Sequence, residues 1–152
     1  MVRIEASRTF PVDREVGFDY ITDPMNWPQY WADLVEIPDL GQATWQKPGD
    51  TMRLRMRLAG RLTDLHMTLD QLDRPALVRY HTAQQGMPDA THERYFDAAA
   101  GGFRYRLVVS FAPRAGLAGL FDRTLFRYAA ARALRRTLDN LGRQLPTRNQ
   151  TA

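Results

Sequence analysis

The sequence predicts an α+β fold in which a curved antiparallel sheet of about seven strands wraps around one long C-terminal helix, with two short helices after the first strand. Two observations predict this arrangement. Between residues 34 and 111, several segments alternate apolar and polar residues with the period of two that is typical of half-buried strands. Residues 117–145 contain no proline and carry apolar residues at helical spacing. A strongly twisted antiparallel sheet curls, so a long helix can lie in its hollow.

The first part of the chain is predicted to be a strand followed by a two-helix corner. Residues 2–10 alternate as a strand does. Asp13 is a suitable N-cap for the first helix. Asp23 and Pro24 end that helix and start a second short one over residues 26–33.

The middle of the chain is predicted to form the sheet. Its expected strands cover residues 51–59, 61–72, 77–82, 91–98 and 103–111. Alternating arginines give the first of these strands an arginine-lined outer face. If the turn at residues 73–75 is symmetric, Met67 lies opposite Tyr80 and Leu69 lies opposite Val78, which makes a plausible inward set.

The final helix is expected to face the sheet along one stripe. A 4-3-4-3 spacing selects residues 120, 124, 127, 131, 134, 138, 141 and 145. In the first half of the helix this stripe carries Thr124 and Arg127. An apolar row lies beside it, formed by Leu117, Phe121, Leu125 and Tyr128.

Composition limits the classes of protein that fit. The 152 residues are 44% hydrophobic and 25% charged, which predicts one globular domain, over residues 1–146, with a polar tail at 147–152. The absence of cysteine excludes disulfides, thiol nucleophiles and cysteine-ligated zinc. No apolar run reaches the length of a membrane span, and the first residues lack a secretory pattern, so we expect a cytoplasmic protein without a transmembrane segment.

Positive charge is concentrated at the C-terminal end. Residues 1–113 carry 13 basic and 15 acidic groups, a net charge of −2, whereas residues 114–152 carry 8 and 2, a net charge of +6. A basic helix can face phosphate, anionic lipid or water. The strands lack basic clusters interleaved with aromatic residues, so we expect no nucleic-acid partner.

Two parts of the sequence, one near each end, resemble a known superfamily. The run FPVDREVGFDYITDPMNWPQYW, residues 10–31, resembles the opening of START-like (SRPBCC) proteins. Residues 101–107, GGFRYRL, and 113–117, PRAGL, followed by the arginine-rich helix, resemble the polyketide cyclase/dehydrase-like branch. The resemblance implies a helix-grip fold with an internal cavity between the sheet and the long helix. It does not imply one activity, because lipid carriers, cyclases and stress-related binders share this scaffold.

The candidate ligand-binding residues are the aromatic corner, the inward faces of the strands and the first turns of the final helix. Large aromatic rings either seal the end of the core or form a ligand rim, and flexible methionines suit either a core or an adaptable cavity. The expected lining is Trp27, Tyr30, Trp31, Met52, Leu54, Met56, Met67, Tyr80, Glu93, Tyr95, Tyr105, Leu107, Phe121, Thr124, Arg127 and Tyr128.

The strand at residues 91–98 allows two orientations. One turns Glu93 and Tyr95 inward, and we favour it because Tyr95 would then lie near Tyr105. The other turns inward His92, Arg94 and Phe96.

Two charged residues are candidates for catalysis. In the favoured orientation, Glu93 is a carboxylate in an apolar cavity with a raised pKa, as a general acid or base requires, unless it pairs with a nearby arginine. Arg127 pairs with a buried group such as Glu93 or with a ligand carboxylate or phenolate, or else it turns out to water. The resemblance makes Arg127, Tyr80 and Tyr105 analogues of the cyclase side chains that hold polyketone oxygens.

The three histidines suggest a row rather than a metal site. With symmetric turns, His66 lies opposite His81 and His81 opposite His92, on the outer face, too far apart to converge on one ion. We therefore expect no metal and no cofactor.

The leading hypothesis is binding or carriage of a hydrophobic or aromatic small molecule, lipid- or polyketide-like, by a monomer or homodimer. The alternative is a cyclase or dehydratase acting on an enolisable polyketone, so the sequence leaves open whether the protein is an enzyme. A weaker alternative is transient contact of the basic C-terminal helix with a membrane surface or a partner.

Overall fold

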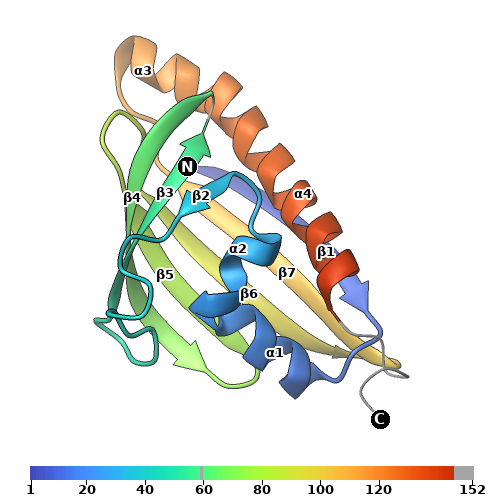
Figure 1. Cartoon of the computed structure of the whole chain (residues 1–152). Helices are drawn as coiled ribbons and strands as arrows, with labels where there is room; N and C mark the ends of the chain where they lie inside the picture. Colours follow the sequence, from blue (N-terminus) through green and yellow to red (C-terminus); the bar gives the residue numbers. More distant parts are fainter. Residues whose placement is uncertain (59, 146–152) are drawn as a thin grey trace.

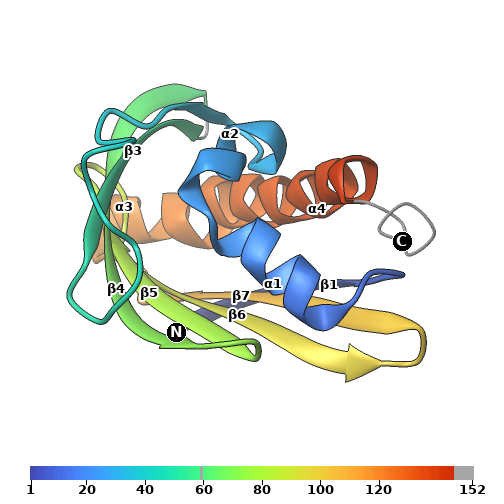
Figure 2. The same cartoon turned by 60° about the horizontal axis from the view of Figure 1, so that its bottom comes forward.

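The computed structural model describes residues 1–58 and 60–145. Its sheet has seven antiparallel strands in the order β1-β7-β6-β5-β4-β3-β2. The strands are β1 Val2–Phe10, β2 Leu34–Glu36, β3 Thr51–Leu58, β4 Arg61–Asp73, β5 Leu77–Ala83, β6 Ala90–Ala99 and β7 Gly102–Phe111. The predicted helix-grip architecture is confirmed, because the sheet curls around the C-terminal helix (Figures 1 and 2).

All helices of the described chain lie on the concave side of the sheet (Figure 2). They are α1 Arg14–Thr22, the 3₁₀ helix η1 Pro24–Asn26, α2 Trp27–Tyr30, α3 Gly116–Phe121, the π-helix η2 Asp122–Phe126 and α4 Arg127–Gln144. The predicted corner starts as a 3₁₀ turn at Pro24, where the Asp23 carboxylate accepts a hydrogen bond from the Met25 amide at 3.0 Å. None of these helices has both the length and the apolar composition that crossing a bilayer requires.

The core lies between the concave sheet face and the helices. Its largest fully buried side chains include Phe18 of α1, Phe96 of β6 and Phe103 of β7. The C-terminal half of the final helix packs against the sheet as predicted, because Leu134, Leu138, Leu141 and Leu145 are all buried.

The predicted stripe is wrong in the first half of that helix. Leu120, Thr124 and Arg127 are exposed. The reason is the π-helix η2, whose wider turn changes which residues face the sheet, so that Asp122 and Phe126 are buried instead. Local sequence spacing does not reveal such a turn.

Asp122 ties this turn to the segment after β7. Its carboxylate accepts hydrogen bonds from the Arg114 backbone amide at 2.8 Å, from Nε at 3.0 Å and from Nη2 at 2.7 Å. Gly119 permits the close approach, because a Cβ there would lie 2.0 Å from the Arg114 carbonyl oxygen. The start of the long helix is therefore held by an ion pair rather than by core packing alone.

The register of the β4–β5 hairpin is not symmetric. A bulge between Leu69 and Gln71 places Leu69 opposite Tyr80 and Met67 opposite Thr82, so both predicted cross-strand pairs are wrong. Tyr80 and Val78 nevertheless point inward, as expected.

The orientation of β6 is the opposite of the favoured prediction. Tyr80 pairs with His92, and Leu107 pairs with Arg94. Residues directly opposite each other on paired strands share a face, and successive residues of one strand alternate between faces. His92 and Arg94 therefore point into the concave side and Glu93 points out. This also breaks the predicted histidine row: His66 and His81 are on the outer face, and His92 is inside.

Candidate functional site

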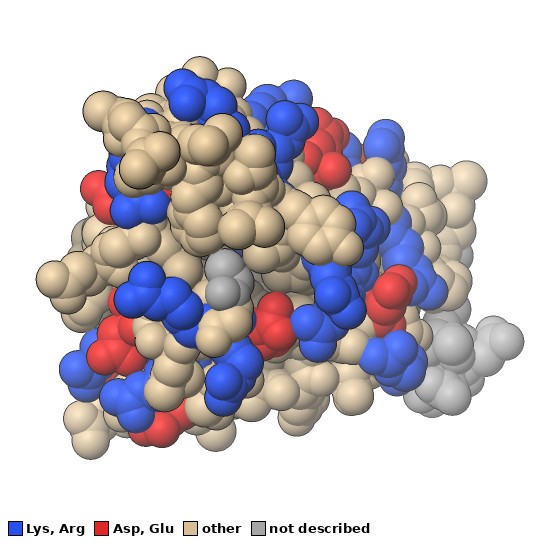
Figure 3. All heavy atoms as spheres, turned by 90° about the horizontal axis from the view of Figure 1, so that it is seen from above, with Lys and Arg blue, Asp and Glu red and all other residues tan. Residues whose placement is uncertain are grey.

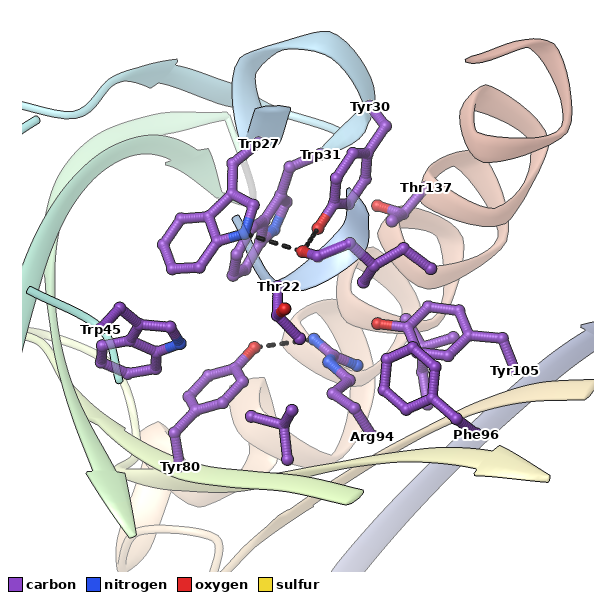
Figure 4. Close-up of a pocket in the computed structure, with 13 residues that line it drawn as sticks. Thr22, Trp27, Tyr30, Trp31, Trp45, Tyr80, Arg94, Phe96, Tyr105 and Thr137 are labelled. Carbon is purple, nitrogen blue, oxygen red and sulfur yellow. Dashed lines mark hydrogen bonds between the residues drawn. The ribbon is translucent and has the colours of Figure 1, made fainter. Parts of the chain in front are cut away.

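Two neighbouring cavities lie between the sheet and the helices. The first, the aromatic cavity, measures about 30 Å³. Its walls come from the α1–α2 corner, β5, β6, β7 and α4, together with Trp45 from the loop after β2 (Figure 4). The lining residues are Ile21, Thr22, Trp27, Tyr30, Trp31, Trp45, Val78, Tyr80, Arg94, Phe96, Tyr105, Leu107 and Thr137.

The second, the helix-side cavity, measures about 80 Å³ and lies against the first turns of α4. Its walls are mostly aliphatic, and the side formed by β5, β6 and the loop between them carries polar residues. The lining residues are Trp31, Met56, Leu58, Leu65, Thr82, Gln84, Ala90, His92, Arg94, Val109, Phe126, Ala129, Ala130, Ala133 and Leu134.

Trp31 and Arg94 line both cavities, so these two side chains form the partition between them. The Trp31 indole is half-buried and makes no hydrogen bond with any described residue; its ring contacts are with Trp27 at 5.2 Å and Tyr80 at 6.5 Å between centroids. Packing alone therefore holds this part of the partition.

The neighbouring rings of the corner are held more firmly. The Trp27 indole Nε1 donates a hydrogen bond to the Ile21 carbonyl at 3.0 Å, and the Tyr30 hydroxyl donates to the same oxygen at 2.6 Å. Burial raises the pKa of Tyr30 well above its usual value, so its phenol stays protonated. The two rings seal the end of the core and also form the cavity wall.

Arg94 is the charged residue of the site. Only 8% of its surface is exposed. Its Nη2 donates to the Tyr80 hydroxyl at 2.8 Å, and the guanidinium carbon lies 5.6 Å from the Tyr80 ring centroid. Its Nη1 is buried and has no hydrogen-bond partner among the described residues, and none of their carboxylates pairs with it. Arginine remains charged in proteins, so the site holds an uncompensated positive charge.

Phenols surround that charge. Figure 4 shows the Arg94 guanidinium between the rings of Tyr80 and Tyr105. Burial raises the pKa of both tyrosines, even though Arg94 acts in the opposite direction, so both keep their protons and can donate. The Tyr105 hydroxyl makes no hydrogen bond with a described residue.

His92 supplies a neutral polar group. Its ring stacks on Tyr80 with 4.6 Å between centroids, and its Nε2 lies 3.0 Å from the Thr82 hydroxyl. Burial and, less strongly, the charge of Arg94 lower the pKa of His92 well below its usual value. The imidazole is therefore neutral at pH 7, and its buried Nδ1 has no partner within residues 1–58 and 60–145.

Comparison with known protein families identifies the family of this chain. Residues 1–146 match the family described as "Polyketide cyclase / dehydrase and lipid transport". The chain belongs to this family. No curated protein sequence matches it.

Solved structures share the fold of this family member at low sequence identity. Zhui aromatase/cyclase from Streptomyces sp. R1128 is 15% identical, with a TM-score of 0.78 over 94% of this chain and 92% of that one. TTHA0849 from Thermus thermophilus is 13% identical, with a TM-score of 0.76 over 93% and 95%. CV1439 from Chromobacterium violaceum is 13% identical, with a TM-score of 0.73 over 95% and 98%. At these identities the similarity shows a common fold and no common activity.

About half of the predicted site residues line the two cavities of this polyketide cyclase/dehydrase-family protein. They are Trp27, Tyr30, Trp31, Met56, Tyr80, Tyr105 and Leu107. Met52, Leu54 and Met67 are buried in the core but line neither cavity. Phe121 is half-buried, and Thr124, Arg127 and Tyr128 are exposed because η2 turns them away from the sheet.

The prediction for Glu93 is wrong. Its carboxylate lies on the outer face, where Tyr95 donates a hydrogen bond at 2.5 Å and Arg79 Nη2 lies at 3.0 Å. The hydrogen bond from Tyr95, followed by that from Arg79, lowers the pKa of Glu93. Glu93 and Tyr95 thus belong to an outer ion-pair group, which includes a contact of Arg106 with the Tyr95 ring at 4.4 Å. The cause is the orientation of β6, which places Arg79 directly opposite Glu93.

The sequence reasoning missed Trp45 and Thr137 and placed Arg94 on the wrong face. A signal existed for Arg94, because the second orientation of β6 contained it. Trp45 lies in a polar loop, where its large ring is the only local signal that favours burial. Thr137 lies on α4, where its hydroxyl accepts a hydrogen bond from the Ala32 amide at 3.1 Å. The described residues contain no group of three metal-type ligands.

Proposed function

We propose that this protein binds an apolar or aromatic small molecule in the space between the sheet and α4. The observation that carries the proposal is the pair of mainly apolar cavities that share two wall side chains, Trp31 and Arg94. Ligand sites are typically apolar with a few convergent polar groups, which is the character of this lining.

Binding requires the partition to move. Cavities of about 30 Å³ and 80 Å³ hold only a few water molecules. Sites for small-molecule ligands usually measure roughly 300–1,000 Å³. Trp31 is the side chain best suited to move, since its indole is half-buried and forms no hydrogen bond within the described chain. Turning it joins the two cavities.

Trp31→Ala tests this proposal. We expect the variant to bind the neutral fluorescent probe N-phenyl-1-naphthylamine about tenfold more tightly than the wild type, because the wild type must first displace the indole. Fluorescence titration measures both affinities. Tyr128→Ala, which removes an exposed ring outside the cavities, serves as the control and should match the wild type. Absence of saturable binding to both wild type and Trp31→Ala would reject the proposed function.

The cyclase alternative loses both of its candidate catalytic residues, because Glu93 and Arg127 lie outside the cavities. Its two tyrosines, Tyr80 and Tyr105, do line the aromatic cavity. The polar groups inside include Arg94, His92, Gln84 and the tyrosines. These groups can hold the polar atoms of a ligand without any reaction, so we propose binding rather than catalysis.

We also propose a second function, contact with an anionic membrane surface. Figure 3 views the end of the molecule that carries α3, and basic side chains border an uncharged area there. The apolar side chains at this end are strongly exposed: Leu117 by 86%, Leu120 by 59%, Leu125 by 64% and Tyr128 by 63%. The neighbouring exposed arginines, Arg123 and Arg127, form no salt bridge with a described residue. In a helix that lies in the membrane interface, leucines enter the boundary of the acyl chains and arginines contact the anionic headgroups. The exposed residues at this end of the molecule fit that arrangement.

Vesicle sedimentation tests the membrane contact. We expect the wild type to sediment with vesicles of phosphatidylserine and phosphatidylcholine, less so at high salt, and the double variant Leu117→Ser/Leu120→Ser to bind about tenfold more weakly. Val35→Ser is the control, because Val35 is an exposed apolar residue on β2. Equal sedimentation of the double variant and the control would contradict the proposal. Self-association without vesicle binding would assign the surface to a protein partner instead.

A further inference from the structure

The charge balance of the cavities is unusual. Two half-buried arginines on neighbouring parts of the sheet have acidic partners: Arg79 lies 3.0 Å from Glu93, and Arg106 lies 2.6 Å from Asp97. Arg94 is more deeply buried than either and has no acidic partner among the described residues. A buried charge without a counter-ion is strongly unfavourable, whereas one paired with an anion is much less so. The part of the chain that the structure describes therefore supplies no negative charge at this position.

The unpartnered polar atoms gather at the same place. In the described chain, three buried side-chain atoms have no hydrogen-bond partner: Arg94 Nη1, His92 Nδ1 and Gln84 Oε1. All three residues line the helix-side cavity. Buried polar groups are nearly always paired, so this concentration indicates a site that polar atoms of another molecule complete.

The donors near Arg94 favour an anionic oxygen over a neutral one. Tyr80 accepts a hydrogen bond from Arg94, which leaves its own proton free to donate. The Tyr105 hydroxyl has no partner within the described chain. A guanidinium with two phenols matches an oxygen anion, because hydrogen bonds to a charged acceptor are roughly twice as strong as neutral ones.

The cavity wall near Arg94 indicates what the rest of the ligand is like. On the α4 side, the helix-side cavity is bounded by Ala129, Ala130 and Ala133, small residues that leave room beside the helix. Phe126 and Leu134 complete that wall. An apolar body in this cavity would place a polar head group against Arg94.

We propose that the ligand is a monoanionic amphiphile whose negatively charged oxygen head, a carboxylate or an ionised phenol, is held by Arg94 while its apolar body occupies the cavities. This inference rests on the proposed binding function and adds the charge of the ligand to it. It requires no chemical step.

Matched pairs of probes test the charge requirement. Isothermal titration at pH 8 compares 2-naphthoate with 2-naphthamide, which have nearly the same shape. A second arm compares 4-nitro-1-naphthol, ionised at this pH, with its methyl ether. We expect the wild type to prefer at least one anion over its neutral partner by tenfold or more, and the arm that shows the preference identifies the head group.

Variants test whether Arg94 causes the preference for the anionic probe. Arg94→Met should lose the preference for the anion, so that its affinities for the two members of each pair become equal. Arg127→Met removes the same charge from an exposed position and should keep the preference. Because it removes an unpaired buried charge, Arg94→Met should have an unchanged or raised melting temperature without ligand.

The outcomes separate the two proposals. Equal affinity of the wild type for the anionic and neutral members of both pairs would overturn the inference and leave the binding function standing. Failure of all four probes and of N-phenyl-1-naphthylamine to bind would reject the binding function itself. If Arg94→Met does not fold, the wild-type ratio still decides, together with Arg94→Lys, which keeps the charge and should retain part of the preference.

Discussion

Asp122→Ala is expected to lower the free energy of unfolding by about 3 kcal/mol at pH 7. Asp122 is 0% exposed, and its carboxylate accepts three hydrogen bonds from Arg114. The substitution leaves the Arg114 backbone amide and guanidinium without their acceptor where the chain enters α3. This loss of stability should lie at the lower end of the range for breaking a buried ion pair, because the Arg114 side chain is 32% exposed and water can solvate part of it.

The effect should depend on pH. Hydrogen bonds from the Arg114 side chain lower the pKa of Asp122 in the folded protein. The ionised carboxylate therefore stabilises the fold above the unfolded pKa of about 3.9, and this contribution is lost as pH falls through the lower folded value. Urea unfolding of wild type and Asp122→Ala at pH 7 and near pH 3 should show a difference that shrinks in acid.

Asp139→Ala is the matched control. Asp139 also lies in the C-terminal helical region and pairs with an arginine, Arg8, at 3.4 Å, but its side chain is 67% exposed. Exposed pairs contribute at most about 1 kcal/mol. Equal losses for Asp122→Ala and Asp139→Ala would show that burial of the Asp122 pair has no special effect.

Gly17→Ala is expected to lower the free energy of unfolding by about 1–3 kcal/mol. Helix propensity alone predicts the opposite, a gain of roughly 0.5–1 kcal/mol. The reason for the loss is contact: a Cβ on Gly17 would lie 2.3 Å from Cε1 and 2.5 Å from Cζ of Phe103. Phe103 is 0% exposed and packs between Phe10 and Phe96, so its ring cannot easily move.

The Gly17→Ala substitution should also disturb the aromatic cavity. Displacing α1 moves the Ile21 carbonyl, which holds both Trp27 and Tyr30. Urea unfolding measures the stability, and Phe103→Leu in the Gly17→Ala background should recover part of the loss. Gly142→Ala is the control, because its Cβ would meet only the flexible end of Arg8. A Gly17→Ala variant as stable as Gly142→Ala would refute the close packing of α1 on β7.

Much of the fold could be predicted because its signals are local. Alternation over two residues identifies β3 and β7 without knowledge of their partners, and helical spacing identifies the buried leucines of α4. The aromatic corner was also predictable, since Trp27, Tyr30 and Trp31 stand together in sequence and line the aromatic cavity together.

The candidate site was less predictable because it depends on relations between segments. The face that β6 presents to the core follows from its pairing with β5 and β7 across a loop whose length leaves both orientations open. A shift of one residue exchanges Glu93 for Arg94 in the cavity and replaces a carboxylate by a cation. The two catalytic candidates, Glu93 and Arg127, lie outside the cavities because of this shift and because the π-helix η2 turns Arg127 outward.

The sequence by itself determined the order of strands and helices, the helix-grip architecture and the aromatic character of one end of the cavity, because periodicity and clustered rings are properties of neighbouring residues. Only the tertiary structure decided the charge inside the cavity and the role of Trp31 as a partition. Both depend on which side chains from β5, β6, α2 and α4 meet across the hollow of the sheet, and distance along the chain carries no information about that meeting.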